Sequence, residues 1–205
     1  MTYNQPYEIV GFHGCDKEIG LKILNGNMDL APSRNTWDRL GEGIYFWEQN
    51  PVRALRYAEE SALGVQFNKT RIQTPFIIGT TIKLGNCLNL IEPESLAMLG
   101  ETYNILIQLL SNISNRIPIN NGANRALGCA VIKYLHIVQL EKGLKSYDTI
   151  RSSFEEGKEI YPTAPFTSRQ HIQVCVLNPD NISGYFLPRP LEKFNPYLFR
   201  SPTLN

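Results

Sequence analysis

The chain has 205 residues, of which 42% are hydrophobic and 19% are charged, and its formal net charge is +1 at pH 7. This length and composition predict one well-packed globular domain. The near-neutral charge argues against a general attraction to nucleic acid or to an anionic membrane. No apolar run approaches the roughly 20 residues that span a bilayer, and the first residues lack the pattern of an export signal, so we expect a cytoplasmic protein. The 4 cysteines are scattered without a CxxC pair, which predicts reduced thiols and no metal site.

The first part of the chain contains clear strand and helix signals. Asp16 is placed to cap a helix, and Asn50 followed by Pro51 is a typical helix start. The pattern of apolar residues predicts, in chain order, a strand over 7–13, a helix over 17–24, a loop over 29–39, a strand over 43–47 and a helix over 51–63.

The second part places two helices between groups of strands. The pattern predicts strands over 75–84 and 86–90, helices over 94–114 and 123–141 around a polar loop at 118–122, an irregular segment over 146–165, and strands over 171–176 and 182–187. Strands without regular βαβ alternation indicate an α+β fold. We expect a single domain over 1–190 with a helical insertion at about 94–143, followed by an extended tail over 191–205.

Two glycine-containing motifs carry the functional signal. The first is His13-Gly14, and the second is the run from Gly41 through Gly43, Tyr45 and Phe46. Glycine lets a flat ligand approach the backbone, while imidazole offers a directed hydrogen bond and phenol offers a stacking face. This combination suits a flat aromatic ring attached to a ribose, as in the nicotinamide half of NAD.

These motifs resemble the ADP-ribosyltransferase fold of the diphtheria-toxin and poly(ADP-ribose) polymerase type. The chain also resembles a family of small bacterial proteins that share its later motifs, which here read His171-Ile172-Gln173, Asn178-Pro179 and Gly184-Tyr185-Phe186. The resemblance implies split antiparallel sheets with flanking helices and a helical insertion. It also implies an enzyme that uses NAD as a substrate, without a metal, and transfers ADP-ribose to a protein or nucleic-acid acceptor. A toxin-like or defence role would suit that activity.

The resemblance also implies roles for individual residues. His13 would bond a hydroxyl of the nicotinamide ribose, the backbone of Gly14 would hold the carboxamide, and Tyr45 would stack on the ring. Arginine binds phosphate oxygens through two parallel hydrogen bonds, so Arg34 or Arg151 could bind the diphosphate, although a solvated loop arginine is equally expected at Arg34. The remaining cofactor-binding candidates are Ser33 and Gly43.

The third catalytic position departs from the family pattern. The family places a glutamate at the start of a late strand, where the chain has Gln170, His171 and Gln173; the last two share a strand face. An amide bonds a ribose hydroxyl but supplies no negative charge to a developing cation, a loss of a few kcal/mol or several hundredfold in rate. Four glutamates are possible substitutes. Glu48 lies on the opposite strand face from Tyr45 unless the strand bends there, and a solvated acidic loop is the simpler interpretation of Glu155, Glu156 and Glu159.

Several alternatives remain open at the level of sequence. Water as the acceptor would make the protein an NAD glycohydrolase, and the missing glutamate favours an inactive module that binds NAD or ADP-ribose. An RNA 2′-phosphotransferase of the same fold needs several arginines around a phosphate, and the spacing of the available arginines shows no dedicated cluster: Arg34, Arg39, Arg53, Arg56 and Arg71. A purely structural protein gives no reason for the two motifs to occur together.

Overall fold

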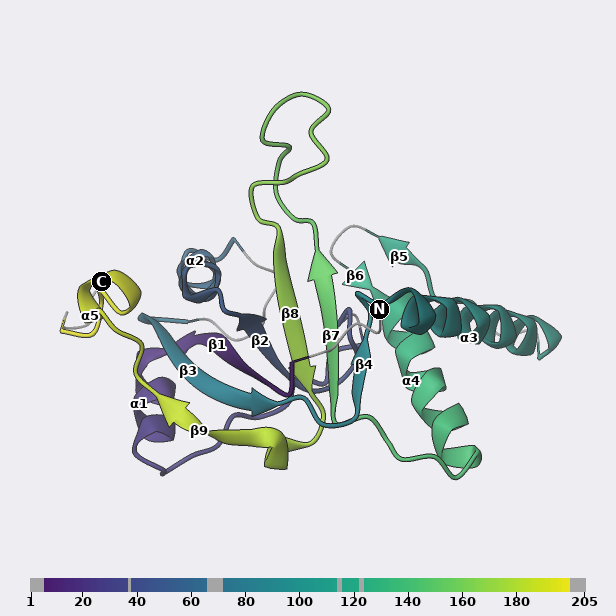
Figure 1. Ribbon diagram of the computed structural model, residues 1–205. Coiled ribbons are helices and arrows are strands. Elements are labelled where there is room, and N and C mark those ends of the chain that lie inside the picture. The colour runs from purple at the N-terminus through teal and green to yellow at the C-terminus, as the bar shows by residue number, and fades with distance from the viewer. Residues whose placement is uncertain (1–5, 37, 66–71, 114–115, 122–123, 200–205) are drawn as a thin grey trace.

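The computed structural model describes residues 6–36, 38–65, 72–113, 116–121 and 124–199. Figure 1 shows a mixed β-sheet with helices on both faces and a pair of helices at one end. The strands of the sheet are β1 (Glu8–Asp16), β2 (Ile44–Glu48), β3 (Pro75–Lys83), β4 (Cys87–Asn89), β7 (Thr149–Phe154), β8 (His171–Val176) and β9 (Ile182–Phe186). The helices are α1 (Lys17–Leu24), α2 (Pro51–Ala62), α3 (Pro93–Asn112), α4 (Ala126–Glu141) and α5 (Leu191–Phe194), with a 3₁₀ turn η1 (Pro179–Asn181).

The seven strands form one sheet in the order β4-β7-β8-β2-β1-β3-β9. Neighbouring strands are antiparallel except β4 and β7, which run parallel. The chain passes through α3 and α4 between these two strands, and only a long crossover of this kind allows adjacent strands to run parallel. The predicted α+β class is therefore confirmed, and the prediction of wholly antiparallel strands was wrong at this edge.

The sheet is weakly joined between β1 and β2. Nine residue pairs join β1 to β3, whereas two pairs, Gly11 with Glu48 and Phe12 with Trp47, join β1 to β2. Beyond Phe12, β1 continues to Asp16 along β3 while β2 follows β8. The sheet thus has two well-paired parts that meet over a short ladder.

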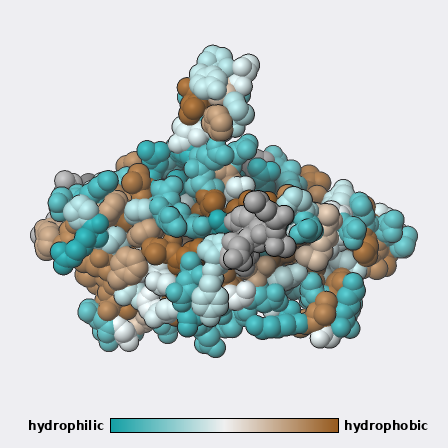
Figure 2. Space-filling view, viewed as in Figure 1, coloured by the Kyte–Doolittle hydropathy of each residue, from teal (hydrophilic) through white to brown (hydrophobic). Residues whose placement is uncertain are grey.

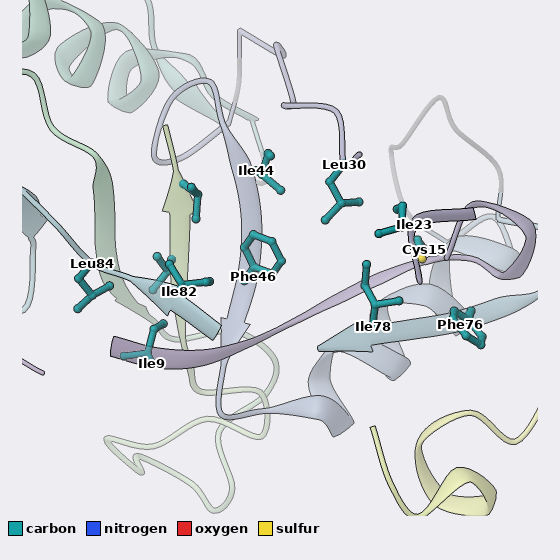
Figure 3. Close-up of a cluster of buried hydrophobic side chains, with 12 residues drawn as sticks. Ile9, Cys15, Ile23, Leu30, Ile44, Phe46, Phe76, Ile78, Ile82 and Leu84 are labelled. Carbon is teal, nitrogen blue, oxygen red and sulfur yellow. The ribbon is translucent and has the colours of Figure 1, made fainter. Parts of the chain in front are cut away.

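Helices cover the sheet on two faces. The α1 face, which carries Ile9, Cys15 and Phe46, packs against Ile23 of α1 in the cluster that Figure 3 shows. On the opposite face, here called the α2 face, Phe12 and Trp47 pack against α2. Farther along this second face, α4 packs through Ile132 and Leu135 against Ile150 and Cys175. The α2 face is therefore covered by two different helices.

Local sequence signals explain the start of two helices. The Asp16 side chain accepts a hydrogen bond from the Glu18 backbone N–H and caps α1. Asn50 accepts from the Arg53 N–H, with Pro51 at the first position of α2. Both helix starts are confirmed, because capping depends on residues within one turn.

Three other predictions need correction. The first strand continues past His13 to Asp16. The polar loop at 118–122 includes β5 (Asn120–Asn121), which forms a small hairpin with β6 (Asn124–Arg125). The segment 146–165 was predicted to be irregular, but it contains β7, which pairs with β8 over six residues. The strand was missed because its sequence, Thr-Ile-Arg-Ser-Ser-Phe, lacks a clear alternation of apolar and polar residues.

The segments that flank β7 and β9 also have defined positions. Residues 155–170 form a long loop that projects from the sheet beyond β7 and β8, as Figures 1 and 2 show. Of the segment predicted as an extended tail, residues 191–199 lie within the described structure; they contain α5 and pack through Phe194 and Tyr197 against the cluster of Phe12 and Ile77. There the buried Asn195 side chain accepts from the Ile77 N–H at 2.8 Å and donates to the Ile77 carbonyl at 3.1 Å.

Candidate functional site

His13 bridges β1 and β2 just past the end of their ladder. Its Nδ1 lies 2.8 Å from the backbone carbonyl oxygen of Tyr45. A carbonyl only accepts hydrogen bonds, so Nδ1 carries a proton, and the neutral ring keeps Nε2 as an acceptor. Burial lowers the pKa of His13 below its ordinary value, and the hydrogen bond to Tyr45 only partly opposes this effect. The imidazole is therefore neutral at pH 7 and has one nitrogen left for a ligand.

Gly14 presents a backbone edge at the same place. The Val10 carbonyl accepts from the Gln49 N–H at 2.9 Å on the β2 side of β1. Backbone groups alternate along a strand, so the N–H and C=O of Gly14 also face β2, beyond the last ladder pair. A side chain at Gly14 would lie 2.4 Å from the Ala54 carbonyl oxygen. Glycine is therefore needed for α2 to pack here, in addition to any contact with a ligand.

Tyr45 holds the turn that precedes β2. Its hydroxyl donates to the Gly41 carbonyl at 2.6 Å and accepts from the Leu40 N–H at 3.1 Å. Burial raises the pKa of the Tyr45 phenol well above its ordinary value, so the hydroxyl stays protonated. By strand alternation its ring lies on the α2 face, whereas His13 lies on the α1 face with Phe46. A ligand that touches both side chains would have to lie in the gap where the strands part.

Gly43 and Ser33 support this turn through their backbones. The Ser33 N–H donates to the Gly43 carbonyl at 2.8 Å, and the Gly43 N–H donates to the Ser33 carbonyl at 3.1 Å. A side chain at Gly43 would lie 2.4 Å from the Cys175 sulfur, so glycine allows β8 to approach. The Ser33 hydroxyl bonds the Asp38 carboxylate at 2.5 Å, while Arg34 is exposed. The structure therefore gives Gly43 and Ser33 local structural roles.

The register of β8 separates the three candidates for the missing glutamate. Cys175 pairs with Tyr45 and Gln173 pairs with Trp47, so His171 and Gln173 share the face of the Tyr45 ring. Gln170 lies outside the strand and is exposed. Gln173 is partly exposed, and its side chain has no hydrogen-bond partner within the part of the chain that the structure describes. Gln173 is therefore the free polar group of β8 nearest to Tyr45.

Three of the four glutamates considered do not lie beside Tyr45 and His13. Glu48 receives two hydrogen bonds from Arg151, from Nε at 2.6 Å and from Nη2 at 2.8 Å. Both side chains of this pair are less than a tenth exposed, and strand alternation places them on the α1 face, away from Tyr45. Glu159 accepts from the Thr163 N–H within the projecting loop, and Glu155 is exposed.

Glu156 lies instead in a charged cluster beside the start of β8, which sequence reasoning missed. Arg53 Nη2 donates to Glu156 at 2.9 Å, and Arg39 lies 3.3 Å from its other oxygen. Burial favours protonation of Glu156, but the hydrogen bond from Arg53 and the nearby charges outweigh it, so its pKa is lowered. The Arg53 guanidinium lies over the Trp47 ring, and Trp47 lies 6.4 Å from His171 between ring centroids. The members come from the loop before β2, from β2, from α2, from the loop before β8 and from β8 itself, so no spacing rule brings them together.

His171 is held in one orientation within this cluster. Its Nδ1 lies 2.6 Å from the Arg169 carbonyl oxygen and therefore donates to it. Burial lowers the pKa of His171, and the hydrogen bond to Arg169 only partly opposes this. The ring is neutral at pH 7, and its Nε2 is a buried acceptor without a hydrogen-bond partner among the described residues.

Comparison with known proteins gave no match to any protein-family model, curated protein or solved structure. Within the described residues, no helix is both long and apolar enough to cross a membrane. In that same part of the chain, no three or more His, Cys, Asp or Glu side chains are grouped so that they could hold a metal ion.

Proposed function

We propose that this protein is an NAD-using enzyme of the ADP-ribosyltransferase type. It would cleave the bond between nicotinamide and ribose and transfer ADP-ribose to a protein or nucleic-acid acceptor. The observation that carries the proposal is the hydrogen bond from His13 to the Tyr45 carbonyl at the point where β1 and β2 part. The resemblance leads us to expect two split sheets, whereas the strands here form one sheet; the short ladder between β1 and β2 is the feature of that sheet which supports the proposal.

Each group at the gap has a chemical role in this proposal. The free Nε2 of His13 would accept a hydrogen bond from a ribose hydroxyl, and the backbone edge of Gly14 would bond the nicotinamide carboxamide. The Tyr45 ring would stack against nicotinamide. Gln173, on the same face as that ring, would bond the ribose near the anomeric carbon. These contacts fix the substrate so that the glycosidic bond is directed toward an acceptor.

Gln173 also explains why we expect slow chemistry. The transition state develops positive charge on the ribose, and an amide lacks the negative charge that would stabilise it. The two buried or half-buried glutamates nearest the site, Glu48 and Glu156, are each paired with arginine. This shortage of a free carboxylate favours one alternative, an inactive module that binds NAD or ADP-ribose. The convergence of Arg39 and Arg53 supports a second, a phosphotransferase that binds an RNA phosphate.

The test is nicotinamide release from NAD by the purified protein, with and without cell lysate. Release that requires lysate indicates a transferase, and release without lysate indicates a glycohydrolase. Both should disappear in His13→Ala. NAD binding by calorimetry without release would favour the binding module, and absence of both binding and release would refute the proposal.

A glutamine-to-glutamate exchange tests the role given to Gln173. We expect Gln173→Glu to raise the rate of nicotinamide release by about several hundredfold, because one preorganised charge contributes roughly 3–4 kcal/mol to such a transition state. Gln170→Glu adds the same charge at an exposed position outside β8 and is the matched control. A rate increase in Gln170→Glu alone would show that the position of the missing glutamate is Gln170.

A further inference from the structure

The charged cluster on the α2 face has several buried donors without acceptors. Among the described residues, Arg53 Nε and Nη1 and Trp47 Nε1 have no hydrogen-bond partner. Arg53 is 7% exposed and Trp47 is 4% exposed. Each such group is costly to bury alone, so this concentration of unpaired donors next to one another requires an explanation.

The charged side chains of the cluster also carry a net positive charge. Arg39, Arg53 and Arg169 contact two glutamates, Glu60 and Glu156, at distances between 2.9 and 4.0 Å. Three arginines against two glutamates leave positive charge, and of the three arginines Arg53 is the most deeply buried. Arg and Trp side chains donate but cannot accept, so the missing partner is a group rich in acceptor oxygens with negative charge.

We propose that Arg39, Arg53 and Trp47 form a binding site for a phosphate group, and that the Glu156 carboxylate fills this site in the free protein. Arginine binds phosphate through the same paired hydrogen bonds that it makes to a carboxylate. A phosphate has more acceptor oxygens than Glu156, so it would also satisfy donors that are unpaired in the free protein.

The chemistry around the site indicates a sugar phosphate. The Nε2 of His171 is a buried acceptor without a partner in the described chain, and the His171 ring lies 6.4 Å from the Trp47 ring between centroids. An ionised phosphate oxygen cannot donate to it, but a neighbouring sugar hydroxyl can. The ligand is therefore expected to carry a phosphate or diphosphate next to a ribose.

Ligand entry would move Glu156 and the loop that carries it. The side chains of Glu156 and Arg39 are 27% and 29% exposed, whereas that of Arg53 is 8% exposed, so solvent reaches the site from the side of Glu156. Glu156 lies at the base of the loop 155–170, where its carbonyl accepts from the Arg169 N–H. Phosphate binding would therefore shift the projecting loop along with the carboxylate.

The site does not depend on NAD being the substrate. If the proposed function holds, the diphosphate of NAD is the natural occupant; if it fails, the same donors would still bind a phosphate. Inorganic pyrophosphate and ADP-ribose test this site separately from the proposed enzyme, because neither compound contains the nicotinamide–ribose bond that the enzyme would cleave.

The test is calorimetric titration of the full chain with pyrophosphate, ADP-ribose and adenosine. We expect pyrophosphate and ADP-ribose to bind and adenosine to bind far more weakly. Glu156→Gln should bind both phosphates about tenfold more tightly, because it removes a competing charge and still accepts from Arg53. Glu155→Gln removes the same charge from an exposed neighbour and should match the wild type.

A variant of Arg39 tests the donor side of the site. Because Arg39 is partly exposed, we expect the protein to fold without its side chain. Arg39→Ala should bind pyrophosphate about tenfold or more weakly, whereas Arg56→Ala, an exposed arginine of α2, should bind it like the wild type. Equal affinities in Glu156→Gln and Glu155→Gln, or in Arg39→Ala and Arg56→Ala, would overturn the proposal. Pyrophosphate binding without nicotinamide release would uphold this site and refute the proposed enzyme.

Discussion

The absence of a side chain at Gly14 is required by the packing of α2 on β1. A methyl group there would lie 2.4 Å from the Ala54 carbonyl oxygen, a backbone atom that cannot move alone. We expect Gly14→Ala to lower the free energy of unfolding by about 1–3 kcal/mol, measured by urea denaturation. Gly100→Ala is the control, since nothing lies within 4 Å of the added group and alanine favours a helix by roughly 0.5–1 kcal/mol. Equal stability of the Gly14 variant and the wild type would contradict the packing argument.

The ion pair of Glu48 and Arg151 is the second feature that depends on single residues. Removing one charge of a buried pair leaves the other without compensation, at a cost of about 3–5 kcal/mol. We therefore expect Glu48→Gln to be strongly destabilised in a thermal or urea unfolding experiment. Glu42→Gln breaks the exposed pair with Lys133 and should unfold like the wild type. Similar losses in the two variants would show that burial does not set the strength of the Glu48 pair.

At the scale of elements, α5 serves to bring Asn195 to the edge of β3. The Asn195 side chain bonds both the N–H and the C=O of Ile77, as a neighbouring strand would. Asn195→Ala leaves two buried backbone groups unpaired, and we expect a loss of about 1–3 kcal/mol with faster amide exchange at Ile77. Glu192→Ala changes an exposed residue of α5 and should leave that exchange rate unchanged. Slow exchange at Ile77 in the Asn195 variant would mean that the side-chain bonds are not needed there.

The elements that the sequence predicted are those with short-range signals. The caps of α1 and α2 lie within one turn of each helix, and β8 has a continuous β-prone run, so all three could be located without a structure. β7 could not, because its buried polar residue Arg151 is stabilised by Glu48, which lies 103 residues away in the chain. An interaction between residues so far apart in the chain produces no pattern in the sequence around β7.

The residues of the candidate site could likewise be predicted only where a local motif contains them. His13 and Tyr45 were found from two local motifs, and the structure places them in contact through the Tyr45 carbonyl. The cluster around Glu156 joins residues from the loop before β2, from β2, from α2, from the loop before β8 and from β8, and only the folded sheet brings them together. Backbone roles such as those of Gly43 and Ser33 were missed. A sequence motif does not distinguish a glycine that binds a ligand from a glycine that lets a neighbouring strand pack closely.

At the scale of the whole molecule, histidine protonation should set the acid limit of stability. Burial lowers the pKa of all 3 histidines, His13, His136 and His171. The unfolded chain binds protons near pH 6.5, whereas the folded chain binds them only at lower pH. Stability is therefore complete above about pH 6.5 and falls as the pH drops from there toward the folded pKa values.

Thermal unfolding between pH 8 and pH 5 checks this expectation. The melting temperature should be level above pH 6.5 and decline below it, before the carboxylates begin to titrate. His136→Gln lies outside the candidate site and should reduce the decline. A constant melting temperature down to pH 5 would mean that the three imidazoles are solvated in the folded protein.

The position of β8 in the sheet has a consequence for protein synthesis. β8 lies between β7 and β2, yet it begins at residue 171 of 205. A nascent chain can pair β1 with β3 early, but Tyr45 and Trp47 have no neighbouring strand until residues 171–176 have been synthesised. Contacts so distant in sequence also slow folding. A chain that stops before residue 171 lacks β8, so we expect it to form neither the paired edge of β2 nor the surroundings of Tyr45 and Trp47 that the folded sheet provides.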